Sequence, residues 1–205
     1  MKQYLDLSRI IEDKMPVYPG DDTTLLFQTA NIRNDHFASF RLETNMHVGT
    51  HLDAPLHFIE NSKYISDYPV DIFAGKAVLI DVREIELIGL KDEYERLISE
   101  EDIVLFCTGF SEFYGTANYY SKHPILTLEL AEFLVRKKIK MVGLDTPSPD
   151  RDDYLIHHKL LSNDIFIIEN LCNLEKLLPY DSFEIAAFPL KIKAEASPVR
   201  VVAII

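Results

Sequence analysis

The segment with the most chemical content covers residues 47–58 and reads HVGTHLDAPLHF. It contains His47, His51, Asp53 and His57, although the whole chain has only seven histidines. Imidazole and carboxylate groups are costly to bury unless partners satisfy them. We therefore interpret this segment as the metal-binding and proton-transfer site of a hydrolase.

The spacing of these residues predicts their local geometry. His47 and His51 are four residues apart, but Gly49 between them and Pro55 shortly afterwards disfavour a helix. We expect a loop that bends at Gly49 and runs into an extended segment. Alternate residues of an extended chain point to the same side, so His51 and Asp53 should converge.

Two imidazoles and one carboxylate, without a thiolate, are ligands that suit Zn²⁺ or Mn²⁺. Such a set leaves coordination positions open for water, which a catalytic site requires. The alternative is that the histidines are loop residues held by ordinary hydrogen bonds. The pattern HxxxHxD, with His57 four residues after the aspartate, favours the metal site.

Further ligands are expected from a distant part of the chain. His157 and His158 precede the apolar run at residues 165–168, and Glu169 ends it. A glutamate at the end of a buried run needs a cation or hydrogen-bond donors. Helix capping by Glu169 explains the sequence equally well. His123, just before Pro124, is expected to be a loop residue.

Apolar runs and turn signals predict the fold. Buried strands are expected at residues 76–82, 101–110, 140–145, 165–168, 184–193 and 199–205, with a break at residues 195–198. Two shorter strands are expected within residues 25–46, and Thr127 is expected to cap a helix. These elements predict an α/β fold with a mixed sheet, in a single domain that spans residues 1–205.

Composition limits the classes of partner. The net charge of −12 argues against nucleic acids and anionic membranes, because both attract clustered lysine and arginine. No apolar stretch approaches the roughly 20 residues of a membrane span, and the first residues do not form a secretory signal. We expect a cytoplasmic protein that acts on a small molecule.

The central segment resembles the HxGTHxDxPxHF signature of the cyclase family of metal-dependent hydrolases, which includes bacterial kynurenine formamidase and isatin hydrolase. The resemblance extends along almost the whole chain. It covers the segments DLSRIIEDKMPVYPGD, GLDTPSPD, HHKLLSNDIFIIENLCNL and FPLKIKAEASPVRVVAII.

This resemblance implies a compact swivelling β/β/α fold that assembles into homo-oligomers, either dimers or tetramers. It implies that His47, His51 and Asp53 hold a metal ion. In members with two ions, Asp53, His157 and Glu169 would hold the second. The implied cofactor is therefore Zn²⁺ or Mn²⁺, with one or two ions per subunit.

The resemblance also assigns three more positions. His157 is preferred over His158 because it stands three residues before Leu160, as in the family pattern HxxLL. His57 matches the position assigned to proton transfer. Tyr18 stands where kynurenine formamidases commonly carry Trp or Phe, which makes it a candidate substrate-binding residue; a surface turn is the alternative.

The implied reaction is hydrolysis of an amide carbon–nitrogen bond, with an aryl formamide such as N-formylkynurenine as the leading substrate. A bound divalent ion lowers the pKa of its water to about 7 and polarises the carbonyl, and His57 can protonate the leaving nitrogen. One alternative is hydrolysis of another cyclic amide or lactone, as in isatin. The other is a metal-binding protein without catalytic activity.

Overall fold

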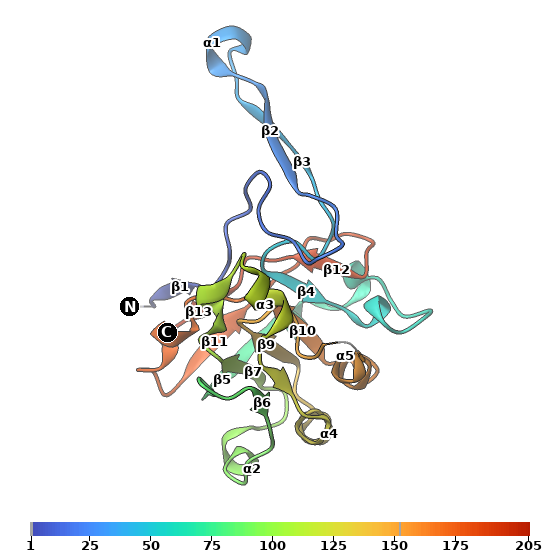
Figure 1. The fold of residues 1–205 in the computed structure, drawn as a ribbon, viewed down its shortest axis with the longest axis vertical. Coiled ribbons are helices and arrows are strands. Elements are labelled where there is room, and N and C mark those ends of the chain that lie inside the picture. Colours follow the sequence, from blue (N-terminus) through green and yellow to red (C-terminus); the bar gives the residue numbers. More distant parts are fainter. Residues whose placement is uncertain (1, 152) are drawn as a thin grey trace.

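The computed structural model describes residues 2–151 and 153–205, which fold around a nine-stranded sheet (Figure 1). In order across the sheet, the strands are β1 (Tyr4–Asp6), β13 (Val202–Ile204), β11 (Phe183–Ala186), β5 (Ala74–Asp81), β7 (Ile103–Cys107), β9 (Met141–Leu144), β10 (Phe166–Glu169), β4 (His51–Asp53) and β12 (Ala196–Pro198). The four strands from β5 to β10 are parallel, and the strands on either side pair antiparallel. The predicted mixed sheet is confirmed.

The parallel strands form the interior because both of their faces are covered. In β7, Ile103 and Leu105 belong to one apolar cluster, whereas Val104 and Phe106 belong to a second cluster. Side chains alternate between the faces of a strand, so the two clusters lie on opposite faces of the sheet. Helices α4 (Leu128–Lys137) and α5 (Leu155–Leu161) cover the second face and lie next to each other (Figure 1).

Helix α4 forms as its sequence predicts. The side chain of Thr127 caps the helix by accepting a hydrogen bond from the backbone N–H of Leu130. Glu129 lies in the first turn, while Arg136 and Lys137 lie in the last, where the helix dipole favours those charges. The basic residues thus have a structural role in the helix.

The carboxyl-terminal strands differ from the prediction. Strand β11 ends at Ala186, well before residue 193, and β12 occupies the region predicted to be a break. The prediction of a break at residues 195–198 was wrong, because Ala196–Pro198 pair with β4. Strand β12 is at the edge of the sheet, where proline is tolerated, and Ser197 lies opposite Leu52 of β4.

A long hairpin extends away from the sheet (Figure 1). It consists of β2 (Leu25–Ala30) and β3 (Ser39–Glu43), joined through the short helix α1 (Ile32–Asp35), so the two strands predicted here are confirmed. Phe27, Phe37 and Phe40 are 43%, 60% and 62% exposed. The hairpin therefore presents aromatic surface that the rest of the described chain does not cover.

The remaining elements are short. They are β6 (Leu87–Ile88), β8 (Ile125–Leu126), α2 (Tyr94–Leu97), α3 (Ala117–Ser121), and 3-10 turns at Pro55–His57, Ile65–Asp67, Val70–Phe73, Phe110–Phe113 and Leu174–Leu177. None of the described helices has the length and the apolar composition needed to cross a membrane.

Gly143, in the middle of β9, provides a test of the packing of this sheet. A Cβ atom there would lie 2.5 Å from Leu105 Cδ2 and 2.9 Å from Leu171 Cδ1. Because both leucines are fully buried, Gly143→Ala should lower the free energy of unfolding by about 1–3 kcal/mol in urea denaturation. Gly89→Ala is the control, since its nearest neighbour would be at 3.9 Å. Equal losses in the two variants would contradict the close packing at Gly143.

Candidate metal centre

The centre begins at the loop before β4. Gly49 has a φ of +57°, in the left-handed region that favours glycine, and Met15 Cε would lie 3.1 Å from an added Cβ. The chain then becomes extended in β4, so His51 and Asp53 lie on the same side of the strand. Both features agree with the predicted loop and extended segment.

The pairing of β4 with β10 brings in the distant glutamate. His51 lies directly opposite Glu169 in the antiparallel register, and Asp53 lies opposite Ile167. His51 Nε2 is therefore 3.2 Å from Glu169 Oε2. Glu169 ends a strand, and Asn173 occupies the N-terminal cap position of the next described helical turn, so helix capping does not explain the glutamate.

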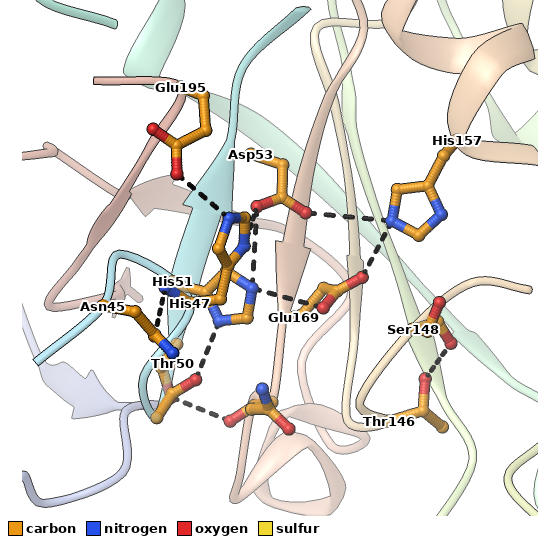
Figure 2. Close-up of polar contacts among 12 residues, drawn as sticks. Asn45, His47, Thr50, His51, Asp53, Thr146, Ser148, His157, Glu169 and Glu195 are labelled. Carbon is orange, nitrogen blue, oxygen red and sulfur yellow. Dashed lines mark hydrogen bonds and ion pairs between the residues drawn. The ribbon is translucent and has the colours of Figure 1, made fainter. Parts of the chain in front are cut away.

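Asp53 and Glu169 each face histidines on two sides (Figure 2). Asp53 Oδ1 is 3.0 Å from His47 Nδ1 and 3.6 Å from His51 Nε2, whereas Asp53 Oδ2 is 3.9 Å from His157 Nε2. Glu169 Oε1 is 3.2 Å from His157 Nε2. The two carboxylates thus lie between His47 and His51 on one side and His157 on the other.

The outer ring nitrogens of His51 and His157 already have hydrogen-bond acceptors. His51 Nδ1 donates to the backbone carbonyl of Gly49 at 3.0 Å, and His157 Nδ1 donates to Asp150 Oδ1 at 2.7 Å. In a neutral imidazole with a hydrogen on Nδ1, Nε2 carries a lone pair. These lone pairs point toward Asp53 and Glu169, an arrangement that needs either a proton or a metal cation between them.

His47 follows the same pattern with its nitrogens exchanged. Its Nε2 lies 3.4 Å from Glu195 Oε1, and its Nδ1 faces Asp53. Asn45 Oδ1 accepts a hydrogen bond from the backbone N–H of His47. An acceptor on the outer nitrogen is the usual way in which proteins orient a metal-binding histidine.

A divalent cation fits these groups. Among the described residues, His51 Nε2, both carboxylate oxygens of Asp53, and Glu169 Oε1 are buried and have no hydrogen bond of acceptable geometry, although ion-pair distances connect them. The ligand atoms of His51, Asp53 and Glu169 lie within 4.8 Å of one another, as do those of His47, Asp53 and His57. Convergent atoms without hydrogen bonds are what a metal ion requires.

The pKa values of the histidines in the centre also indicate that it favours a cation. Burial lowers the pKa of His47, but the charges of Asp53 and Glu169 and the contacts with Asp53 and Glu195 together outweigh it, and the pKa rises to about 10. Burial also lowers the pKa of His157, but the hydrogen bond to Asp150 and the negative charge of Glu169 help to raise it to about 10. Both shifts report a strongly negative potential, which a divalent cation would neutralise.

His57 lies beside this frame. It ends the 3-10 turn Pro55–His57, and its ring centroid is 4.2 Å from that of His47. Burial is the largest influence on its pKa, which is lowered. His57 is therefore placed both for proton transfer and for binding a cation together with His47 and Asp53. His158, by contrast, is exposed on α5 and rests against Phe58.

Two polar residues of the centre were missed from the sequence. Asp150 receives hydrogen bonds from His157 Nδ1 and from the backbone N–H groups of Ile156 and His157. It lies five residues before α5, outside the usual cap position, so its only signal was its place in an acidic loop. Glu195 lies just before β12, where a break was predicted.

A cavity of about 250 Å³ opens onto the centre. Aromatic side chains from separate segments line it: Tyr18, Phe58, Tyr114, Tyr120 and Tyr154. Tyr18 packs edge-on against Tyr120, with 5.8 Å between the ring centroids. The Tyr120 hydroxyl is buried without a hydrogen bond to any described residue, and burial raises its pKa to about 12. It therefore remains a hydrogen-bond donor.

Comparison with known proteins agrees with this centre. A family model described as putative cyclase matches residues 5–151. The chain belongs to the cyclase family. It is 32% identical over 207 residues to the kynurenine formamidase of Bacillus mycoides (strain KBAB4), covering 98% of this chain and 96% of that protein. Its identity to the kynurenine formamidase of Bacillus anthracis is 31% over 208 residues, with the same coverage.

Solved structures share the fold of this cyclase-family chain. A potential metal-dependent hydrolase with cyclase activity superposes with a TM-score of 0.82 at 29% identity, covering 100% of this chain and 98% of the other. Isatin hydrolase A from Labrenzia aggregata superposes with a TM-score of 0.86 and covers 100% and 94%. At 24% identity, the second likeness is one of fold alone.

Asp150 provides a test of how the His157 side is oriented. Asp150→Asn should weaken metal binding by about 10–100-fold, because an amide is a weaker acceptor for His157 Nδ1–H than a carboxylate. Metal content and affinity, measured in competition with a chelator, report this change. Asp153→Asn is the matched control, since Asp153 is an exposed residue of the same loop. Unchanged metal affinity in Asp150→Asn would contradict the orienting role.

Proposed function

We propose that the protein is a metal-dependent hydrolase of amide carbon–nitrogen bonds, with an aryl formamide such as N-formylkynurenine as its substrate. The observation that carries this proposal is the placement of Asp53 and Glu169 between two sets of histidines beside an aromatic cavity. The identity to two kynurenine formamidases over nearly the full chain supports the amide class.

In this proposal, His47, His51 and Asp53 hold one ion, and Asp53, His157 and Glu169 hold a second. Zn²⁺ and Mn²⁺ suit these nitrogen and oxygen ligands. When bound, such an ion lowers the pKa of water to about 7 and polarises the substrate carbonyl. The protein orients each histidine ligand through an acceptor near its outer ring nitrogen.

The chain's own residues supply the remaining steps. His57 lies next to the ligands and protonates the leaving nitrogen. Asn170 follows Glu169 and lines the cavity; its Oδ1 accepts from the Tyr119 hydroxyl at 2.9 Å, and its backbone carbonyl accepts from Thr50 at 2.8 Å. The first bond fixes the side chain and the second fixes the backbone, which leaves the amide N–H groups of the side chain to stabilise charge on the substrate's carbonyl oxygen.

The proposed assembly is a homo-oligomer, either a dimer or a tetramer. An isolated two-stranded hairpin is marginally stable in water unless further surface covers it. The hairpin β2–β3 carries exposed Phe27, Phe37 and Phe40 and extends away from the sheet (Figure 1). A second copy of the chain would bury these rings.

The reaction is tested with purified protein loaded with Zn²⁺ or Mn²⁺. It should release formate from N-formylkynurenine or a simpler aryl formamide, and a chelator should abolish turnover while added metal restores it. Preferential opening of isatin would instead favour the cyclic-amide alternative. Tight metal binding without turnover of any amide or lactone in the panel would support a non-catalytic metal-binding protein and contradict the proposal.

His57→Ala separates proton transfer from metal binding. The variant should retain its metal content but lose about 10²–10⁴-fold in turnover, because it lacks the proton donor. His158→Ala is the matched control, since His158 is exposed on α5. Metal content is measured on the same samples as activity. Loss of metal from His57→Ala would make His57 a ligand, in line with its proximity to His47 and Asp53.

A further inference from the structure

The cavity lining contains acidic side chains but no basic lysine or arginine side chain among the described residues. The acidic residues among them are Glu169, in the metal centre, and Asp21. Arg9 is the cation nearby, but it lines a separate hollow, lies 4.2 Å from the centroid of the Tyr114 ring and donates to the backbone carbonyl of Ser111. Away from the metal centre, Asp21 is therefore the formal charge that a bound molecule meets.

A single turn carries both Asp21 and Tyr18. The backbone N–H of Asp21 donates to the carbonyl of Tyr18 at 3.0 Å, with Pro19 and Gly20 between them. Gly20 has a φ of +104°, as the third position of a type II turn requires, and proline favours the second position. The turn thus brings the residues that carry an aromatic ring and a carboxylate into the lining of the same cavity.

The side chain of Asp21 is exposed and makes no ion pair with the described residues. The cavity that Asp21 lines is also lined by aromatic side chains, and the faces of aromatic rings attract cations. A cavity with a carboxylate and several rings in its lining is a suitable environment for an ammonium group. A carboxylate on the ligand would meet repulsion from Asp21, and away from the metal centre the described lining offers no lysine or arginine to pair with it.

We propose that the cavity selects aryl amides whose substituent remote from the scissile bond is cationic or uncharged, and that Asp21 is the specificity-determining residue. This inference rests on the proposed amide hydrolysis and refines its substrate class. N-formylkynurenine carries both an ammonium and a carboxylate in its side arm. Away from the metal centre, only the ammonium has a charged partner in the described lining, so the analogue that lacks the carboxylate is the better substrate.

The test uses four aryl formamides on the metal-loaded enzyme. Their side arms carry both charged groups of N-formylkynurenine, the ammonium alone, the carboxylate alone, or neither. The value of kcat/KM should be highest with the ammonium alone and lowest with the carboxylate alone, and 0.5 M salt should reduce the difference, since exposed charges are screened above about 0.1 M. Preference for the carboxylate compound would overturn the inference.

Asp21→Asn and its neighbour Asp22→Asn form the variant pair. Asp21→Asn should raise KM for the ammonium substrate by about 2–5-fold, the range for an exposed ion pair, and leave the uncharged substrate unchanged. Asp22 does not line the cavity, so Asp22→Asn should leave all four substrates unchanged. Equal effects of the two variants, or an equal effect of Asp21→Asn on every substrate, would contradict a specific role for Asp21.

Binding of the deformylated amine products, followed by calorimetry, separates this inference from the proposed reaction. These compounds lack the scissile bond, so their affinities report the charge preference of the cavity alone. Tighter binding of the ammonium product than of the carboxylate product supports the inference even if no formamide is hydrolysed. Hydrolysis of all four formamides with the reverse order of binding would support the reaction and overturn the inference.

Discussion

Two carboxylates buried side by side are the constraint on which this structure depends. Asp53 and Glu169 repel each other in an interior where charges are weakly screened, and the inner nitrogens of three histidines face them. Such an arrangement is stable only with positive charge at its centre. The acceptors on the outer histidine nitrogens reinforce this demand, because they direct lone pairs inward. Metal binding is therefore part of the folding energetics of the protein as well as of its chemistry.

One short antiparallel strand, β4, brings the two carboxylates and the histidines together. Strand β4 pairs with β10 on one side and with β12 on the other, so three distant segments meet at Asp53. Strand β10 continues the parallel core, which packs on both faces and fixes the position of Glu169. The centre is thus built on the rigid interior, while the cavity lining comes largely from loops. The rigid strands therefore hold the metal-binding side chains, whose positions must be the most exact.

The sequence was most informative where local chemistry dominates. Gly49 predicted the bend, β4 followed as an extended segment, and Thr127 capped α4 as expected. Resemblance to the cyclase family linked His157 and Glu169 to the same centre. By contrast, Asp150 and Glu195 act through contacts that only the folded chain creates, and no local pattern marks them. Strand β12 was missed because tolerance for Pro198 depends on its position at the sheet edge.

The turn from Tyr18 to Asp21 lies between β1 and β2, outside the strands and the helix that carry the metal centre. Its conformation is set by Pro19 and Gly20, so its first and last side chains can be exchanged without disturbing the backbone. This part of the cavity lining is therefore separate in the chain from the strands and the helix that carry the metal centre. Within this architecture, new specificities can evolve by point substitutions in a four-residue turn while the hydrolytic chemistry is inherited unchanged.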